Sequence, residues 1–155
     1  GMRALAPALS NMESLRVLNL GRNDIGTGIA ALAAVLPTFS QLQELNLWGN
    51  AIDADGVIDF SPALCKIPRL QRLNLSGNSI GSEGMRALAP ALSNMESLRV
   101  LNLGRNDIED EAIIVLRVLI PVMRNLKELA VGMSTEVITE LKELSEICGS
   151  TLKIS

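Results

Sequence analysis

The chain has 155 residues, a formal net charge of −3 at pH 7 and a hydrophobic content of 48%. This composition predicts one folded domain, and the mild net charge neither requires nor excludes a charged partner. The sequence has no His, no Tyr and two Cys, so the residues that most often perform acid–base catalysis or bind zinc are nearly absent. We therefore expect no enzymatic activity, no cofactor and no metal site.

The first fourteen residues have the apolar pattern of a helix. Their apolar residues recur at spacings of three and four: Met2, Leu5, Leu9 and Met12. The twenty-five residues 1–25 recur unchanged at 84–108. Because the interior copy has to be structural, we do not interpret the first copy as a targeting segment. No strand precedes this helix, so we expect an uncapped edge through which the chain could self-associate.

Five similar segments follow in chain order. They are LRVLNLGRN from Leu15, LQELNLWGN from Leu42, LQRLNLSGN from Leu70, LRVLNLGRN from Leu98 and a degenerate LKELAVGMS from Leu126, spaced by 27, 28, 28 and 28 residues. Each alternates like a strand and then continues with the apolar spacing of a helix. We predict a single domain, 1–155, with these parts: a helix-only partial repeat 1–14, repeats 15–41, 42–69, 70–97 and 98–125, and a capping repeat 126–155.

The connection between units determines the predicted architecture. A helical crossover returns the chain to the same end of the sheet, so the strands should be parallel. Strands lie ~4.8 Å apart whereas packed helices need ~8–10 Å, so the stack should curve with its strands on the concave face. Gly56 and Gly84 are predicted just ahead of their helices, where they would permit a tight turn. The expected fold class is α/β, a horseshoe-shaped solenoid with helices on the convex face.

The pattern LxxLxLxxNxI followed by a helix, at 27 to 28 residues per unit, resembles the ribonuclease-inhibitor class of leucine-rich repeats. The resemblance covers nearly the whole chain and implies a buried ladder of asparagine side chains that bond to loop backbone. In this sequence the matching residues are Asn23, Asn50, Asn78 and Asn106. The fifth unit has Ser134 at this position, so the ladder should end there. The class includes inhibitors, Ran GTPase-activating proteins and sensor domains, so the resemblance does not assign a function.

Residues that alternate with the buried leucines should point into the concave face. This face is predicted to hold six basic residues and two acidic ones, although acidic residues outnumber basic ones in the whole chain, 17 to 14. The candidate binding residues are Arg16, Arg22, Glu44, Asn46, Trp48, Arg72, Asn74, Arg99, Asn102 and Arg105. A basic face favours an acidic protein surface, and the alternative is that arginine is only a soluble filler on exposed strands.

Trp48 is the only tryptophan. It is the seventh residue of its segment, a position at which the other four segments have Gly or Ser. An exposed tryptophan at the centre of a surface is a frequent anchor in protein interfaces. The alternative is that its ring lies flat over neighbouring backbone. With no basic run and no further aromatic residue for base stacking, the pattern does not favour nucleic acid as a partner.

Three apolar residues on the fourth predicted helix, Ile114, Val118 and Val122, stand where the third unit has Arg86, Pro90 and Asn94, at positions that the repeat normally gives to solvent. They could pack against the capping repeat or form a second interface. The apolar run 112–123 is too short for the ~20 residues of a membrane helix, so no membrane association is expected. Cys65 and Cys148 are predicted to be three helix spacings apart and unpaired, which favours a reducing compartment such as the cytoplasm.

These observations predict a non-enzymatic protein-interaction module that binds an acidic protein surface through its concave face. The alternative is a structural or regulatory fragment of a larger leucine-rich repeat protein, or an engineered repeat protein with no natural ligand.

Overall fold

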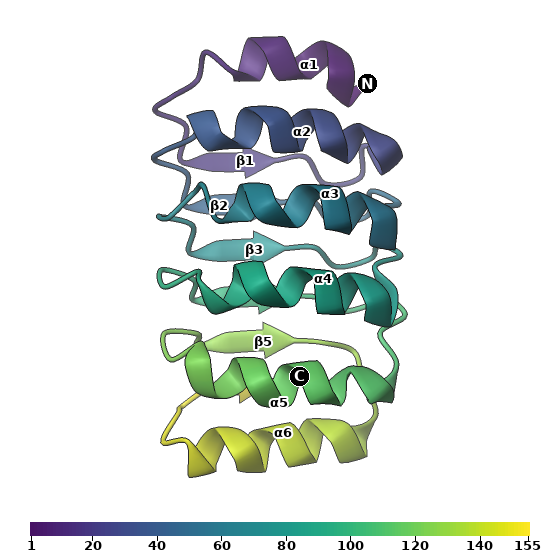
Figure 1. The fold of residues 1–155 in the computed structure, drawn as a ribbon, viewed down its shortest axis with the longest axis vertical. Helices are drawn as coiled ribbons and strands as arrows, with labels where there is room; N and C mark the ends of the chain where they lie inside the picture. The colour runs from purple at the N-terminus through teal and green to yellow at the C-terminus, as the bar shows by residue number, and fades with distance from the viewer.

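The computed structural model describes residues 1–155, which form two layers, a six-stranded sheet and a row of helices on one of its faces (Figure 1). Neighbouring strands are parallel and follow the order of the chain. The strands are β1 (Val17–Asn19), β2 (Glu44–Asn46), β3 (Arg72–Asn74), β4 (Val100–Asn102), β5 (Glu128–Ala130) and β6 (Lys153–Ile154). The predicted α/β solenoid with parallel strands is confirmed.

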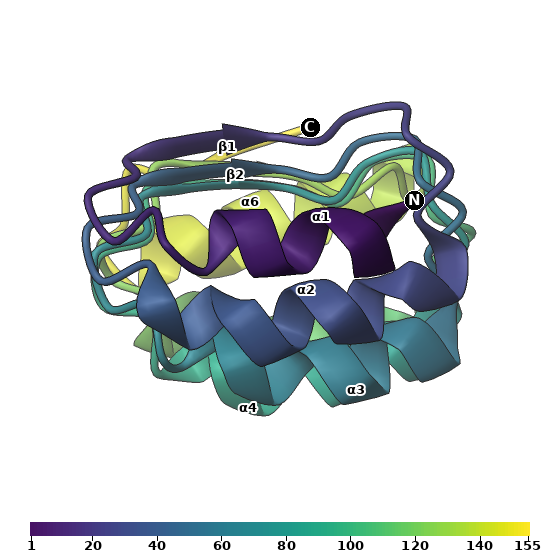
Figure 2. The same ribbon diagram turned by 90° about the horizontal axis from the view of Figure 1, so that it is seen from above.

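The second layer consists of six α-helices. They are α1 (Met2–Leu9), α2 (Ile29–Val35), α3 (Ala54–Leu64), α4 (Gly81–Ser93), α5 (Ile113–Val122) and α6 (Thr135–Ile147), with short 3-10 turns at Gly26–Gly28, Leu36–Thr38 and Asp110–Ala112. Figure 2 looks along the stack and shows β1 standing above β2, and α1 above α2. Both layers therefore curve, and the sheet lies on the concave side, as the different spacings of strands and helices require.

The core lies between the two layers and continues through every unit. The central strand leucines pair in register, Leu18 with Leu45, Leu45 with Leu73, and so on to Leu129. All five are buried. Helix residues such as Leu32, Phe60 and Leu88 are fully buried and cover this row from the other layer. Because each unit packs against its sequence neighbours, burial follows the repeat.

The placement predicted for Gly56 and Gly84 is wrong. Both residues lie inside the first turn of their helices, α3 and α4, and both are buried. A Cβ on Gly84 would lie 2.6 Å from Cγ2 of Ile80, and one on Gly56 would lie 3.1 Å from Cγ2 of Ile29. These glycines permit close packing of the helix starts, and the tight turns are made by other residues.

The asparagine ladder joins adjacent units through their loops. The Asn50 amide donates to the carbonyls of Leu20 and Leu47, both at 2.9 Å, and its Oδ1 accepts from Asn23 N at 2.9 Å. Asn78 repeats this arrangement one unit further on. The Asn106 amide donates in the same way to the carbonyls of Leu75 and Leu103, and its Oδ1 accepts from Ile80 N at 3.5 Å. These three side chains are buried, whereas Asn23 is exposed.

Candidate functional site

The first residue of each strand points away from the helices and forms a column across the concave face. In register order the column reads Val17, Glu44, Arg72, Val100, Glu128 and Lys153. Acidic and basic side chains are therefore neighbours, and Arg72 Nε lies 3.6 Å from Glu44 Oε1. Both side chains are about half exposed, so this ion pair contributes little stability but offsets charge on the surface.

Arg16 and Arg99 lie one residue before β1 and β4, outside this column. Arg99 Nη1 donates to the carbonyl of Asn125 at 3.2 Å, which directs the side chain toward the loop that enters β5. Arg16 and Arg99 therefore lie apart from Glu44 and Arg72, the predicted binding residues in the column. Lys153 was not among the predicted binding residues, although the apolar residues on either side of it, Leu152 and Ile154, predict that its side chain faces the opposite way.

Arg22 and Trp48 form a stacked pair where β1 and β2 end. The Arg22 guanidinium carbon lies 4.4 Å from the centroid of the indole ring. The ring is half-buried because it rests against two glycines: a Cβ on Gly77 would lie 3.0 Å from Nε1, and one on Gly21 would lie 3.6 Å from Cε3. Trp48 therefore does lie over neighbouring backbone, and it also supports an arginine.

Arg22 is exposed, and its guanidinium forms no hydrogen bond or ion pair within the chain. Arg105 occupies the equivalent position after β4 and has nearly the same backbone conformation, with φ values of 58° and 57° for the two residues. Stacking on an aromatic face fixes a guanidinium without using its N–H donors. Arg22 is therefore held in place with its donors directed to solvent.

The third residue of each of the first four strands is an asparagine. Asn19, Asn46, Asn74 and Asn102 are in register across β1 to β4, and Ala130 takes this place in β5. Each Oδ1 accepts from the backbone N–H two residues further on, at 3.0 to 3.1 Å. These side chains therefore shape the chain where it leaves the strand.

Two shallow hollows on the concave face contain these columns. One, of about 240 Å³, is lined by Glu44, Arg72, Asn46, Asn74 and Asn102. The other, of about 400 Å³, lies between β4 and β6 and is lined by Val100, Glu128 and Lys153 among others. The predicted residues Glu44, Asn46, Arg72, Asn74 and Asn102 are thus brought together, and Arg22 with Trp48 lies beyond the strand ends.

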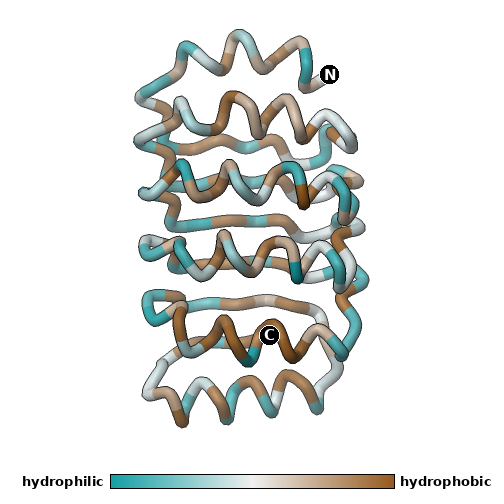
Figure 3. The backbone as a smooth tube through the Cα atoms, in the orientation of Figure 1, coloured by the Kyte–Doolittle hydropathy of each residue, from teal (hydrophilic) through white to brown (hydrophobic).

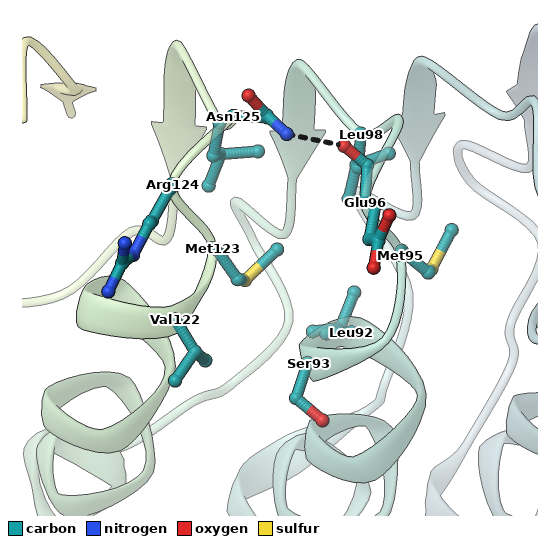
Figure 4. A pocket seen from close by; sticks show the side chains of 10 residues that line it. Leu92, Ser93, Met95, Glu96, Leu98, Val122, Met123, Arg124 and Asn125 are labelled. Atoms are coloured by element: carbon teal, nitrogen blue, oxygen red, sulfur yellow. Dashed lines mark hydrogen bonds between the residues drawn. The ribbon is translucent and has the colours of Figure 1, made fainter.

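A further crevice of about 210 Å³ lies between the loops that follow α4 and α5 (Figure 4). Asn125 Nδ2 donates to the carbonyl of Glu96 at 2.9 Å across it, and Met95 and Met123 are among the residues that line it. The crevice has one acidic and one basic side chain, Glu96 and Arg124, which do not form an ion pair. It is a gap between two packed loops.

The apolar stripe on α5 is exposed to solvent, so the alternative in which it packs against the capping repeat is wrong. Ile114, Val118 and Val122 are 67%, 68% and 51% exposed. Figure 3 shows α5 coloured as hydrophobic over most of its length. Arg117, on another side of the same helix, donates from Nε to Glu140 Oε1 of α6 at 2.7 Å. That ion pair occupies the contact with the capping helix and leaves the stripe facing outward.

No group of three or more His, Cys, Asp or Glu side chains lies close enough together to hold a metal ion. Cys65 and Cys148 are unpaired, as predicted, and both are exposed. No helix is both long enough and apolar enough to span a membrane.

The profile of the family described as "Leucine Rich repeat" matches four segments of the chain, residues 11–33, 41–61, 68–89 and 94–116. These segments cover more than half of the sequence, and the chain belongs to this family of repeat proteins. No curated protein matches the chain at a significant level.

Two solved structures have a similar fold. A Caenorhabditis elegans tropomodulin C-terminal domain aligns with a TM-score of 0.74 and 16% identity, over 93% of each chain. Leiomodin-1 actin-binding site 2 aligns with a TM-score of 0.78 and 16% identity, over 97% of this chain and 86% of the other. At this level of identity the likeness concerns the fold.

Proposed function

We propose that this chain is a non-enzymatic protein-interaction module that holds an acidic protein surface on its concave face. The stacked pair of Arg22 and Trp48 is the anchor, with Arg105 at the matching position three strands away. Arg72 begins β3, which lies between those strands. A guanidinium offers forked donors that suit carboxylates, and one that is already fixed loses less conformational freedom on binding.

The observation that carries this proposal is the state of Arg22. Its guanidinium stacks on Trp48 at 4.4 Å and is exposed without an acidic partner. A structural arginine would normally donate to a carboxylate or a backbone carbonyl, as Arg99 and Arg117 do. The family and the fold also support the proposal, since leiomodin-1 uses a domain of this shape that is named as an actin-binding site. The two free thiols favour a reducing compartment such as the cytoplasm.

Affinity capture from a cell extract tests the proposal with three forms of the chain. The test variant combines Arg22→Glu, Trp48→Ala and Arg105→Glu, which reverses two charges and removes the ring. The matched control carries Arg3→Glu and Arg86→Glu, which reverse two charges on exposed positions of α1 and α4. We expect wild type and control to retain the same acidic protein and the test variant to lose it.

Retention by all three forms would refute binding through the anchor pair. If no form retains a specific protein, the alternative is favoured: a structural or regulatory segment of a larger repeat protein, or an engineered repeat protein with no natural ligand. Circular dichroism melting of each form checks that loss of binding does not reflect loss of folding.

The exposed stripe of Ile114, Val118 and Val122 favours a second role, self-association of two copies through α5. Three neighbouring aliphatic side chains at more than half exposure form the kind of patch that protein interfaces cover. Sedimentation velocity over a range of concentrations tests this role. Val118→Glu should abolish any dimer, whereas Leu5→Glu should do so if the first helix forms the contact.

A further inference from the structure

The orientation of the concave asparagines follows from their partners. The backbone N–H groups of Gly21, Trp48, Ser76 and Gly104 can only donate, so each faces the oxygen of the asparagine two residues earlier. Flipping any of these amides would place two donors against each other. The NH₂ group of each side chain therefore points away from its own loop, and this assignment is determined by chemistry.

None of these four NH₂ groups donates to another atom of the protein, whereas those of the buried ladder residues Asn50, Asn78 and Asn106 all do. Asn19, Asn46, Asn74 and Asn102 thus present a row of unused donors. We call these four the amide row. Three of them line the hollow of about 240 Å³, where a partner's side chains can reach them.

The spacing of the amide row identifies the shape of a matching partner. Its members are in register on adjacent strands, so four of them span about 14 Å. Three turns of an α-helix cover about 16 Å. An extended chain that uses every second side chain would cover about 20 Å in three steps and lose register. A helix that crosses the strands matches the row to within about 2 Å over its whole length.

The chemistry of the amide row identifies the matching side chains. NH₂ groups that only donate require acceptors, and the carbonyls within a partner helix are already used by its own hydrogen bonds. Carboxylates are the strongest acceptors among side chains. Arg22 and Arg105 follow β1 and β4, the two outer strands of the row, and add positive charge along one side of the same path. Glu44 is already offset by Arg72.

We infer that the amide row binds an α-helix of the partner that lies across β1 to β4 and presents Asp or Glu once per turn. This inference rests on the proposed function and specifies the partner's form. It predicts that carboxylates spaced at i, i+4, i+7 and i+11 are recognised, and that the same carboxylates on an extended chain are not. The row ends at Ala130, so about three turns of helix fill it.

The test uses the full chain and two synthetic peptides of about 18 residues, long enough for four to five turns. One is locked as a helix by staples on its far face and carries Glu at i, i+4, i+7 and i+11. The other has the same charge on an extended, proline-containing backbone. Fluorescence anisotropy measures both affinities for wild type, for Asn74→Asp and for the control Gln71→Glu.

Asn74→Asp keeps an oxygen for Ser76 N and replaces the outward donor with an acceptor of the same shape. Gln71→Glu adds the same charge at an exposed position just before β3, outside the row. We expect the helical peptide to bind more tightly than the extended one. Asn74→Asp should weaken it by about tenfold or more, while Gln71→Glu has a smaller effect. Asn74→Asp should also gain affinity for a helical peptide with Lys at the four positions.

Equal binding of the two peptides, or equal effects of the two substitutions, would overturn the inference while leaving an acidic partner for the concave face in place. Failure of the helical peptide to bind at millimolar concentration would also overturn it. The proposed function would then be decided by the capture experiment, which does not depend on the partner's form. Asn46→Asp repeats the measurement at a second position if Asn74→Asp lowers the melting temperature.

Discussion

Residues 1–25 and 84–108 have the same sequence, but they bury different side chains. Leu5 is 41% exposed, whereas its counterpart Leu88 is fully buried at 0%. The local backbone is nevertheless the same: Asp24 and Asp107 both have positive φ, at 47° and 53°. Local sequence thus determines the turn and the helix in both copies, and the neighbouring unit determines which side chains are buried.

The cause is the number of neighbours. The second copy lies between α3 and α5, whereas α1 packs against α2 alone among the helices. Ala6 is buried in α1 while its counterpart Ala89 is half-buried, so the two copies differ in which small side chains they bury as well. A unit inside a solenoid buries its side chains against a neighbour on each side. A unit at the end has one neighbour, so some side chains that would be buried inside the stack stay exposed.

The largest difference in stability is expected between substitutions of Leu5 and of its counterpart Leu88. Leu88→Ala should lower the free energy of unfolding by about 2–5 kcal/mol because it leaves a cavity in a closed core. Leu5→Ala should cost about 1 kcal/mol or less, since much of this side chain already contacts water. Urea denaturation of the two variants measures both values. Equal losses would show that the first helix is as tightly packed as the fourth.

The difference between Leu5 and Leu88 should disappear if the first copy is given a second neighbour. Residues 26–83 placed ahead of Gly1 recreate the junction between Glu83 and Gly84, because Gly1 begins the same twenty-five residues. In this longer chain Leu5→Ala should cost about 2–5 kcal/mol, as Leu88→Ala does in the original. If Leu5→Ala still costs little, the exposure of Leu5 does not come from the missing neighbour.

A somewhat smaller difference is expected for the ladder asparagines. Asn106→Ala leaves the carbonyls of Leu75 and Leu103 without their donor inside the protein, which should cost about 2–3 kcal/mol. Asn23→Ala removes a bond of 2.8 Å to Leu20 at an exposed site, where water can replace it, and should cost under about 1 kcal/mol. Thermal melting followed by circular dichroism distinguishes the two. Similar melting temperatures would contradict the role assigned to burial.

The smallest difference concerns the two arginines that follow the duplicated strands. Arg22→Ala removes a cation–π contact worth about 0.5–1 kcal/mol, and Arg105→Ala removes none. Trp48 is the only tryptophan, so its fluorescence reports on this contact directly. We expect the emission maximum to shift in the first variant and to stay unchanged in the second. A shift in both would place Arg105 within reach of the ring.

The sequence was sufficient for those features that depend on the repeat alone. The 28-residue spacing places the strand leucines and the asparagine ladder, because every unit repeats the same contact with its neighbour. The pairing of Glu44 with Arg72 could also have been found, since the two residues are 28 positions apart. The outward position of Lys153 follows in the same way from the alternation of Leu152 and Ile154.

Other features depend on three-dimensional contacts that a periodic pattern does not encode. Trp48 rests on Gly77 of the next unit and supports Arg22 of the previous one, so its environment comes from three units at once. Gly56 and Gly84 were misplaced because a glycine that ends a turn and one that admits a close contact look alike in sequence. The outward NH₂ groups of the amide row required the hydrogen bonds to be known.

The in-register pairing of every strand also determines how the number of repeat units can change. Removal or repetition of the 83 residues that offset one identical stretch from the other keeps every junction of the chain unchanged. Because β1 and β4 occupy equivalent places in the sheet, either product still joins a helix to its proper strand. A protein of this kind can therefore gain or lose three units at a time, and each remaining unit keeps the same kind of neighbour on both sides.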